Sequence, residues 1–295
     1  MLTGRKLVFI GGDARQIEVI ALATELDASA TLIGFEDLHR SFPDTVNTDL
    51  TVEALASADA IVLPVAGMDD DGRVDSRFSQ HPVFLERKHF SELRPGTLVF
   101  SGIGRVKLET WCDEYQLRLV KLMELDEVAI LNSIPTAEGA IALGMQHTEV
   151  TIHGSVSVVL GFGRCGITLA RSLTALGAEV RVAARKPAHL ARIREMGLQP
   201  IPVEGLPNGL EDADIVFNTV PVMVLSAAVL AQMRKECVVI DIASKPGGTD
   251  FRFAEKRGMT AILAPSLPGL VAPKTAGRII ADTLCRIVAE HSQTV

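Results

Sequence analysis

The sequence predicts an α/β protein with two doubly wound parallel-sheet domains. Short strands of β-branched and apolar residues alternate with helical patterns along the chain, and this alternation is typical of parallel sheets. The chain has 295 residues, of which 47% are hydrophobic, so it is long enough for two domains that each have a core. Three closely spaced glycines also separate a strand at 155–160 from an apolar helical pattern.

Those three glycines organise the second domain. Gly161, Gly163 and Gly166 have the G-x-G-x-x-G spacing of a Rossmann-like dinucleotide-binding fold. In that fold the glycines permit a tight turn, close approach of the backbone to a pyrophosphate, and close packing of the helix on the strand. An ordinary glycine-rich turn is the alternative. The cofactor-binding residues expected in this turn are Gly161, Phe162, Gly163, Arg164 and Cys165.

The end of the next strand, at 178–184, indicates which nicotinamide cofactor is bound. An NAD-selective site usually carries Asp or Glu there, whereas this chain has Ala184, Arg185 and Lys186. A carboxylate would repel a 2′-phosphate and a guanidinium would hold it, so we expect NADP, with NAD possible. The alternative is that Arg185 and Lys186 are solvated charges before a helix that starts at Pro187.

Further cofactor contacts are expected at the carboxyl ends of later strands. A strand at 214–218 runs into Asn-Thr-Val-Pro, whose polar side chains can contact the nicotinamide ribose, and strands at 237–241 and 260–263 follow. The candidates in these segments are Asn218, Thr219, Val220, Pro221, Ala243, Ser244 and Pro268.

The first domain begins with a strand at 6–10 and a turn that carries Asp13 and Arg15. Asp13 is expected to cap the following helix. Arg15 lies where α/β folds bind ligands, so it meets a substrate carboxylate or else stays on a solvated helix face. Strands are expected at 30–34, 59–64, 97–100 and 118–122, and helices at 52–56, 84–90 and 107–115.

Small residues follow two of these strands, at 65–67 and 101–104, where a carboxylate can approach backbone amides. Gly67, Ser101 and Gly102 are therefore substrate-binding candidates. The acidic loop at 69–72 does not fit a calcium site, because its first and twelfth positions would be Gly67 and Phe78. We expect a solvated surface hairpin there and no metal.

A linker helix at 134–150 is expected to open at Pro135 and Thr136 and to run to about His147. Its amino end should face the ligand cleft, so Ser133 and Thr136 are candidates to bind an anion and Glu138 is a candidate base. The alternative is a plain helix cap in which Glu138 favours the helix dipole.

A final helix at 275–289 carries an apolar stripe, which is expected to be core that crosses back to the first domain rather than a docking surface for a partner. The stripe consists of Ile279, Ile280, Thr283, Leu284, Ile287 and Val288. The expected domains are 1–133 for substrate, 134–150 as the linker, 151–274 for NADP, and 275–295 as the returning helix.

Composition limits the function classes. Asp and Glu outnumber Lys and Arg by 36 to 29, and no cluster of basic and aromatic residues is present, so we expect no nucleic-acid partner. No apolar run approaches the roughly 18 residues of a membrane span, and residues 1–6 lead directly into a strand rather than a signal segment. The four cysteines lack paired spacing. A cytoplasmic protein that forms a homo-oligomer is expected.

Several polar motifs resemble the family of the dipicolinate synthase A subunit. They are Asn-Ser-Ile-Pro-Thr-Ala-Glu-Gly at 132–139, Ser-Lys-Pro-Gly-Gly-Thr-Asp-Phe at 244–251, and Leu-Pro-Gly-Leu-Val-Ala-Pro-Lys-Thr-Ala-Gly at 267–277. The shorter segments 146–148, 152–154 and 188–193 agree with them. The resemblance covers essentially the whole chain and is strongest from Asn132 onward.

The resemblance implies oxidation of dihydrodipicolinate, from the lysine branch, to pyridine-2,6-dicarboxylate with reduction of NADP. It also implies a flavoprotein-like partner, the dipicolinate synthase B subunit, and the mother cell of a sporulating bacterium. The two carboxylates would be held by Arg15, the amides of 101–104, Ser133, Thr136 and Lys274. Glu138 and Lys274 are the catalytic candidates, with Glu138 or water as the proton acceptor.

Two other functions remain open. A 2-hydroxyacid dehydrogenase needs a general base, commonly His, yet after His189 this chain has only His291, so the sequence disfavours that reaction. The chain could also be a cofactor-binding partner of the B subunit without chemistry of its own, because its expected catalytic groups are few and mild.

Overall fold

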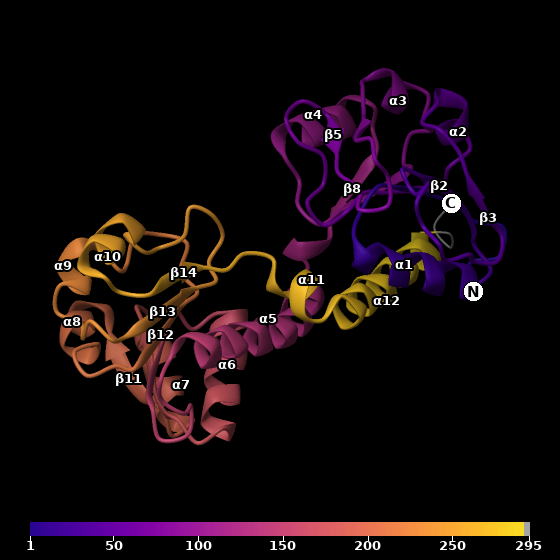
Figure 1. Cartoon of the computed structure of the whole chain (residues 1–295). Helices are drawn as coiled ribbons and strands as arrows, with labels where there is room; N and C mark the ends of the chain where they lie inside the picture. Colours follow the sequence, from indigo (N-terminus) through magenta and orange to yellow (C-terminus); the bar gives the residue numbers. More distant parts are fainter. Residues whose placement is uncertain (292–295) are drawn as a thin grey trace. The chain divides into compact units, whose positions relative to one another are not determined.

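The computed structural model describes residues 1–291 and divides the chain into two compact units (Figure 1). Unit 1 comprises Met1–Leu131 together with the segment from Ala272 onward, and unit 2 comprises Asn132–Val271. Each unit contains one six-stranded parallel sheet with helices on both faces. The predicted fold class is therefore confirmed. The last four residues of the segment expected at 275–295 lie outside the described residues.

The sheet of unit 1 has the strand order β3-β2-β1-β4-β7-β8. Alternate residues of each strand face opposite cores because side chains of a strand alternate between its two faces. Leu7 and Phe9 of β1 pack with α1 and α12, whereas Val8 and Ile10 pack with α2, α3 and α4. The strands are β1 (Lys6–Ile10), β2 (Ser29–Ile33), β3 (Thr45–Asn47), β4 (Ala60–Val62), β7 (Leu98–Ser101) and β8 (Arg118–Lys121).

The helices of unit 1 are α1 (Ala14–Glu25), α2 (Val52–Ala56), α3 (Lys88–Ser91), α4 (Val106–Glu114) and α12 (Pro273–His291), with a 3₁₀ turn η1 (Leu122–Glu124). A small antiparallel hairpin, β5 (Arg73–Val74) and β6 (Val83–Phe84), lies outside the main sheet. The helix expected at 84–90 is wrong at its start: Phe84 belongs to β6, and the helix begins only at Lys88.

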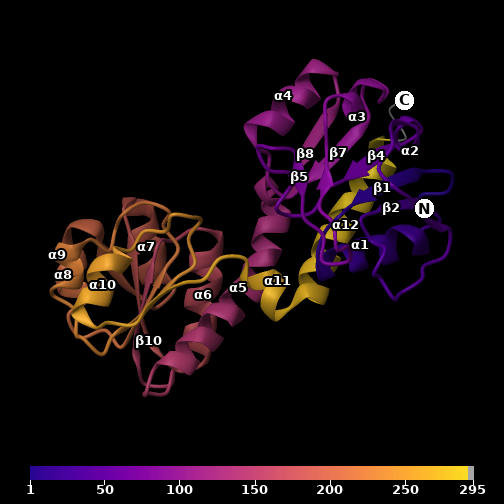
Figure 2. The ribbon, with the colours of Figure 1, turned by 45° about the horizontal axis from the view of Figure 1, so that its top comes forward.

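Helix α12 returns to unit 1 and packs along α1, and Figure 2 shows the two helices side by side. Ile280, Leu284 and Val288 are buried in the core that α1 shares, which confirms the predicted apolar stripe. The contact is close because α12 carries Gly277, where a β-carbon would lie 2.5 Å from the backbone oxygen of Arg15.

Helix α5 (Asp126–His147) begins eight residues before the expected start at 134. Pro135 was expected to open the helix but lies inside it, and the acidic first turn at Asp126 and Glu127 marks the real start, as the helix dipole favours. Ser133 and Thr136 therefore cannot bind an anion at the helix amino end. By length and composition α5 could cross a membrane, a test that core helices also pass, and 44% of its most apolar window is buried.

The sheet of unit 2 has the order β11-β10-β9-β12-β13-β14, with all pairs parallel. Its strands are β9 (Val156–Leu160), β10 (Glu179–Ala184), β11 (Gln199–Pro202), β12 (Ile215–Asn218), β13 (Val238–Asp241) and β14 (Ala261–Leu263). Its helical segments, besides the later part of α5, are α6 (Arg164–Ala175), α7 (Pro187–Glu195), η2 (Val203–Gly205), α8 (Leu206–Gly209), α9 (Ala227–Leu230), α10 (Phe251–Arg257) and α11 (Leu267–Val271).

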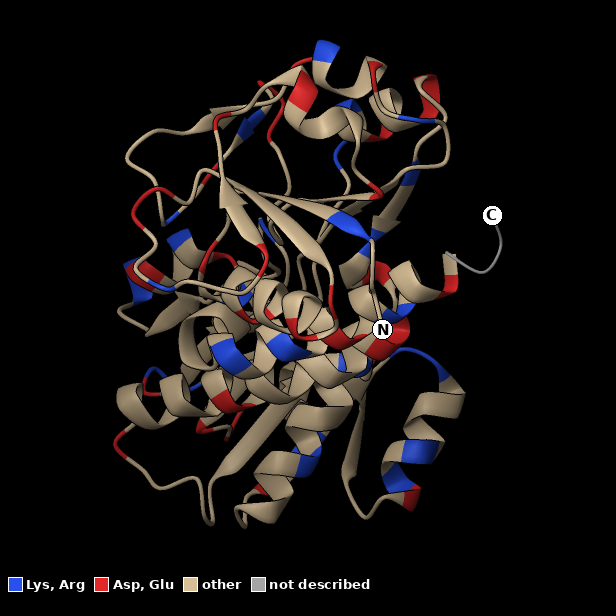
Figure 3. Ribbon diagram, turned by 90° about the vertical axis from the view of Figure 1, so that its right-hand side faces the viewer, with Lys and Arg blue, Asp and Glu red and all other residues tan. Residues whose placement is uncertain are grey.

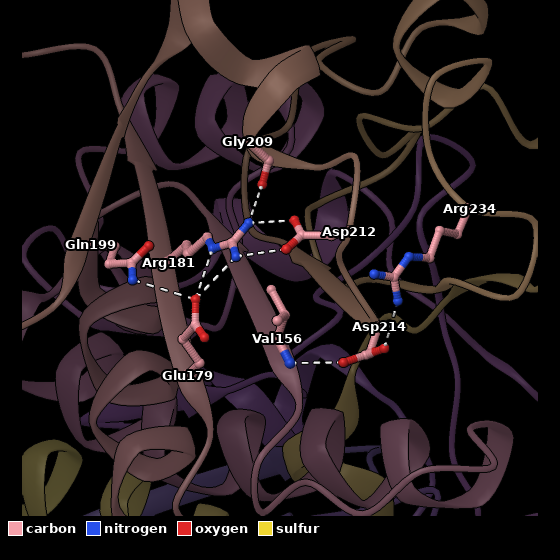
Figure 4. A network of polar contacts seen from close by, with 8 residues as sticks. All are labelled: Val156, Glu179, Arg181, Gln199, Gly209, Asp212, Asp214 and Arg234. Atoms are coloured by element: carbon pink, nitrogen blue, oxygen red, sulfur yellow. Dashed lines mark hydrogen bonds and ion pairs between the residues drawn. The ribbon is translucent and has the colours of Figure 1, made fainter.

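Charged side chains tie β9 and β10 to the segment before β12 in unit 2 (Figure 4). The guanidinium of Arg181 donates to both carboxylate oxygens of Asp212, at 2.6 and 2.9 Å, and to Glu179 at 3.0 Å. Asp214 accepts the backbone N–H of Val156 at 2.8 Å. Over the chain as a whole, Lys and Arg are interspersed with Asp and Glu (Figure 3).

Candidate functional site: two switch-point pockets

In each sheet the chain reverses its winding direction at one point, and α/β folds bind ligands at the carboxyl ends of the strands beside such a point. In unit 2 the reversal lies between β9 and β12, and in unit 1 between β1 and β4. A cavity or pocket occurs at both places. We call the first the unit 2 cavity and the second the unit 1 pocket.

The unit 2 cavity has a volume of about 550 Å³ and is mostly apolar. The loop after β9 and the loop after β12 form two of its walls, and the end of β10 forms a third. Its lining includes nine of the residues predicted to bind the cofactor: Gly161, Phe162, Gly163, Ala184, Arg185, Lys186, Thr219, Val220 and Pro221. It does not include the predicted residues Arg164, Cys165, Asn218, Ala243, Ser244 and Pro268.

The three glycines of the turn differ in whether neighbouring protein atoms leave room for a side chain. Gly161 has a φ of +100°, and a β-carbon there would lie 2.3 Å from the hydroxyl oxygen of Thr219. A β-carbon at Gly166 would lie 2.2 Å from the carbonyl oxygen of Gly161. At Gly163, by contrast, a β-carbon would meet no protein atom within 4 Å. The protein alone therefore gives no steric reason for Gly163, whereas a pyrophosphate at the start of α6 does.

Arg185 and Lys186 follow the end of β10 and are both exposed. Ala184, at the strand end, is buried. Within residues 1–291 neither cation has an ion-pair partner, so both are available to an anion beside the cavity. The ring of His189 packs against Phe162 with 5.6 Å between the ring centroids. Cys165 lies in the first turn of α6, where burial outweighs the nearby charge of Arg164 and raises the pKa of its thiol, so the residue packs rather than reacts.

The polar side chains of Asn218 and Thr219, at the end of β12, form hydrogen bonds that stabilise the loop after this strand. Asn218 is fully buried, and its side chain bonds both the N–H and the carbonyl oxygen of Val220, each at 3.0 Å. The hydroxyl of Thr219 donates to the carbonyl oxygen of Leu160 at 2.8 Å, which ties the loop to β9. These two side chains therefore fix the shape of the cavity wall.

Asp241, at the end of β13, was not among the predicted residues. Its buried carboxylate accepts hydrogen bonds from the backbone N–H of Ala243 at 3.1 Å, the N–H of Gly248 at 2.8 Å and the hydroxyl of Thr249 at 2.7 Å. It thereby orders the loop that carries the predicted residues Ala243 and Ser244. The aspartate that ends a strand directly before Ile-Ala-Ser-Lys-Pro-Gly-Gly-Thr is the sequence signal that could have found it.

The unit 1 pocket has a volume of about 200 Å³. Arg15 and Gly67, two of the candidate substrate-binding residues, line it. Arg15 is only 9% exposed, and its guanidinium donates to both oxygens of Asp13, the shortest distance being 2.6 Å. Asp13 also caps α1 by accepting the N–H of Arg15 at 3.0 Å, as predicted. Burial opposes ionisation of Asp13, but the hydrogen bonds and charge of Arg15 outweigh it and lower the pKa of the carboxyl.

Ser101 and Gly102 support the unit 1 pocket rather than line it. The buried hydroxyl of Ser101 donates to the carbonyl oxygen of Ile103 at 2.6 Å. A β-carbon at Gly102 would lie 2.3 Å from the carbonyl oxygen of Val65, and one at Gly67 would lie 2.7 Å from the hydroxyl oxygen of Ser101. The two small-residue loops therefore pack directly on each other.

The acidic segment at 69–72 forms a tight turn in which Asp70 and Asp71 are exposed, as the predicted solvated hairpin requires. The hairpin that follows it is fastened to the loop after β1: Gly12 donates its N–H to Asp75 at 3.0 Å, and Arg77 donates its N–H to Gly12 at 2.8 Å. This pairing brings Arg73 and Arg77 to the pocket wall, where Arg105 joins them from the start of α4. All three arginines were missed by sequence reasoning.

The remaining predicted residues lie on helices. Ser133 is buried in α5, with its hydroxyl oxygen 2.6 Å from that of Thr168, and Thr136 donates its hydroxyl to the carbonyl oxygen of Asn132 at 2.8 Å. Glu138 is exposed on the part of α5 that belongs to unit 2, and Lys274 is exposed in the first turn of α12, in unit 1. The catalytic roles of Glu138 and Lys274 stay predictions.

The fold and the unit 2 cavity define a class of protein. Residues 136–245 match the family model described as D-isomer specific 2-hydroxyacid dehydrogenase, NAD binding domain. Together with the glycine turn at the switch point, this match identifies an oxidoreductase with a domain for a nicotinamide cofactor.

The remaining comparisons identify the family. Residues 6–123 match the model for the N-terminal domain of the dipicolinate synthase A subunit. The dipicolinate synthase A subunit of Bacillus subtilis (strain 168) is 48% identical over 290 residues, which cover 98% of each chain. The chain belongs to the family of the dipicolinate synthase A subunit, and the predicted resemblance is confirmed.

Two crystal structures of the dipicolinate synthase A subunit agree with this assignment. The structure from Bacillus subtilis has a TM-score of 0.96 at 47% identity and covers 100% of this chain and 99% of its own. The structure from Bacillus halodurans has a TM-score of 0.95 at 47% identity and covers 98% of this chain and 99% of its own.

Proposed function

We propose that the protein oxidises dihydrodipicolinate to pyridine-2,6-dicarboxylate and reduces NADP. Membership of the dipicolinate synthase A-subunit family supports this reaction. The observation that carries it is the wall of the unit 2 cavity, where a glycine turn with open space at Gly163 stands beside the exposed pair Arg185 and Lys186.

The choice of NADP over NAD rests on the end of β10. A 2′-phosphate is a dianion that a guanidinium can bind through two parallel hydrogen bonds. Arg185 and Lys186 supply two cations at the cavity edge, and the strand ends in Ala184 instead of the carboxylate that would bind the 2′-hydroxyl of NAD.

The proposed chemistry makes modest demands on the protein. Removal of one hydride and one proton from the dihydropyridine ring leaves an aromatic ring, so much of the driving force lies in the substrate. Bound NADP supplies the hydride acceptor. The chain must position the ring about 3 to 3.5 Å from that acceptor and hold two carboxylates. Glu138 or water is the proposed proton acceptor, and Lys274 is a proposed further cation for the diacid. Arg15 is already paired with Asp13, so its proposed role is to position the loop after β1.

The cellular setting follows from the same family. We propose that the protein acts with the dipicolinate synthase B subunit in the cytoplasm of the mother cell of a sporulating bacterium. Its substrate would come from the lysine branch, and the protein would work as a homo-oligomer.

A single assay tests the reaction. Purified chain is mixed with NADP and freshly generated dihydrodipicolinate, with and without the B subunit, and the reduced cofactor is followed, with NAD as the comparison. Reduction of NADP by the chain alone is the expected result. Reduction only when the B subunit is present would indicate a shared site and a cofactor-binding role for this chain. Reduction in neither mixture, or failure of both nucleotides to bind, would refute the proposed function.

A further inference from the structure

The unit 1 pocket has the size and position of a site for a small metabolite. It lies at the switch point, between the loops after β1 and β4 and the hairpin of β5 and β6. Its volume of about 200 Å³ is below the range of about 300–1,000 Å³ that is usual for drug-sized ligands. A dinucleotide therefore cannot occupy it, whereas a single small ring can.

The charges around the pocket favour an anion. Four arginines and three aspartates line it, which leaves a net charge of +1. Asp13 neutralises Arg15 at 2.6 Å, and Asp75 neutralises Arg73 at 2.8 Å. The third aspartate, Asp69, accepts the backbone N–H groups of Asp71 and Arg73 at 2.9 and 2.8 Å.

Arg77 and Arg105 are the two cations outside these ion pairs. The charge of Arg77 helps to lower the pKa of Asp13 and that of Arg105 helps to lower the pKa of Asp69, so the pocket keeps one uncompensated positive charge. In the part of the chain that the structure describes, neither guanidinium forms an ion pair or a hydrogen bond. Both are exposed, and they come from different elements: Arg77 from the hairpin segment and Arg105 from the N-cap of α4. A ligand with two separate carboxylates could therefore bind one guanidinium with each, in the bidentate geometry that arginine favours.

We propose that the unit 1 pocket binds a small ring dicarboxylate and that Arg77 and Arg105 each bind one of its carboxylates. That this diacid is the substrate, dihydrodipicolinate, rests on the proposed function. Arg15 and Asp13 act as positioning residues, because their mutual ion pair fixes the loop after β1, to which the Arg77 backbone is bonded.

Binding of stable analogues to the full chain tests the proposal without turnover. Pyridine-2,6-dicarboxylate and benzene-1,3-dicarboxylate carry two carboxylates, and pyridine-2-carboxylate carries one. Calorimetric titration compares the wild type with Arg77→Gln, Arg105→Gln and the control Arg278→Gln, which removes an exposed arginine on α12 whose ion pair, at 3.9 Å, is long. Thermal unfolding and NADP titration of each variant report whether the fold is intact.

We expect each pocket variant to bind both dicarboxylates about 10- to 100-fold more weakly, the effect of losing one charge-assisted pair. The monocarboxylate should bind more weakly to the wild type and respond to only one of the two substitutions. Affinity should fall as salt is raised, because exposed guanidiniums are screened. NADP binding and thermal midpoints should stay unchanged, as should all properties of Arg278→Gln.

The assignment is overturned if both pocket variants bind the dicarboxylates as the wild type does, or if the wild type binds none of the three probes. Its failure is distinct from failure of the proposed function. If the Arg77→Gln, Arg105→Gln double variant had a normal KM for dihydrodipicolinate, the two arginines would not bind the substrate, but the proposed reaction would still stand. If dicarboxylates bound in an arginine-dependent way but the protein showed no turnover, the proposed reaction would be refuted and the proposed binding site would still stand.

Discussion

Gly163→Ala separates binding of the cofactor from folding of unit 2. A β-carbon at this position would meet no protein atom within 4 Å, and the residue's φ of −100° suits alanine. The free energy of unfolding should therefore fall only by the cost of replacing a glycine N-cap with alanine, about 0.5 kcal/mol. That cost corresponds to about 1–2 °C in the thermal midpoint.

The same methyl group would occupy the space through which the backbone approaches a pyrophosphate. Loss of one charge-assisted hydrogen bond between the displaced phosphates and the backbone is expected to weaken NADP binding about 10- to 100-fold. Calorimetric titration with NADP measures the affinity, and thermal unfolding measures the stability. Gly205→Ala is the matched control, because it too has nothing within 4 Å of the added carbon and lies outside the glycine turn.

Gly166→Ala, unlike Gly163→Ala, should lower stability as well as NADP binding. Its added carbon would lie 2.2 Å from the carbonyl oxygen of Gly161, so helix α6 must move off β9, and both stability and NADP binding should fall. If Gly163→Ala bound NADP as tightly as the wild type, or lost as much stability as Gly166→Ala, the interpretation of Gly163 as the site of phosphate approach would be refuted.

The other predictions concern single side chains of unit 2. Arg185→Asp should weaken NADP binding by about 1.5–3 kcal/mol and shift preference toward NAD, and an unchanged ratio of NADP to NAD affinity would exclude Arg185 from the site. Asp241→Ala leaves three donors without their acceptor and should lower the free energy of unfolding by about 3 kcal/mol in urea titrations, so a loss below about 1 kcal/mol would contradict its role in ordering the 242–249 loop. The hydrogen bond and charge of Arg181 outweigh desolvation and lower the pKa of Asp212 from its ordinary 3.8, so their pair stabilises the fold above that pH and the stabilisation is lost as the pH falls below it. Arg181→Gln should therefore cost about 1 kcal/mol at pH 7, since Asp212 is half exposed, and less at pH 3; an equal loss at both pH values would argue against the pair.

Local patterns were sufficient to predict the strands and the cofactor turn. The residues of β9, the three glycines and the cations after β10 are close in sequence, so their spacing alone indicated the fold of unit 2. The start of α5 was missed for a local reason as well. Pro135 favours a first-turn position but was accommodated inside a helix whose acidic first turn, at Asp126 and Glu127, is the better marker.

The charged wall of the unit 1 pocket could not be predicted in this way. Arg77 reaches the loop after β1 only because the hairpin segment pairs with Gly12, more than 60 residues earlier in the chain. The acidic residues at 69–72 indicate only a solvated hairpin, and nothing in the residues that follow indicates that Arg73 and Arg77 belong to a pocket wall. Arg105 likewise joins the pocket through the packing of α4 on the sheet.

The division of unit 1 into two segments has a consequence for biosynthesis. Unit 2 is a continuous stretch, whereas the face of α1 that carries Val19 and Ile20 is covered by α12, which the ribosome makes only after all of unit 2. Unit 2 can thus complete its core while the earlier-made sheet still exposes apolar surface, the reverse of the usual order in which the amino-terminal part folds first. A released chain truncated after Ala272 should be protease-resistant in unit 2 and protease-sensitive in unit 1.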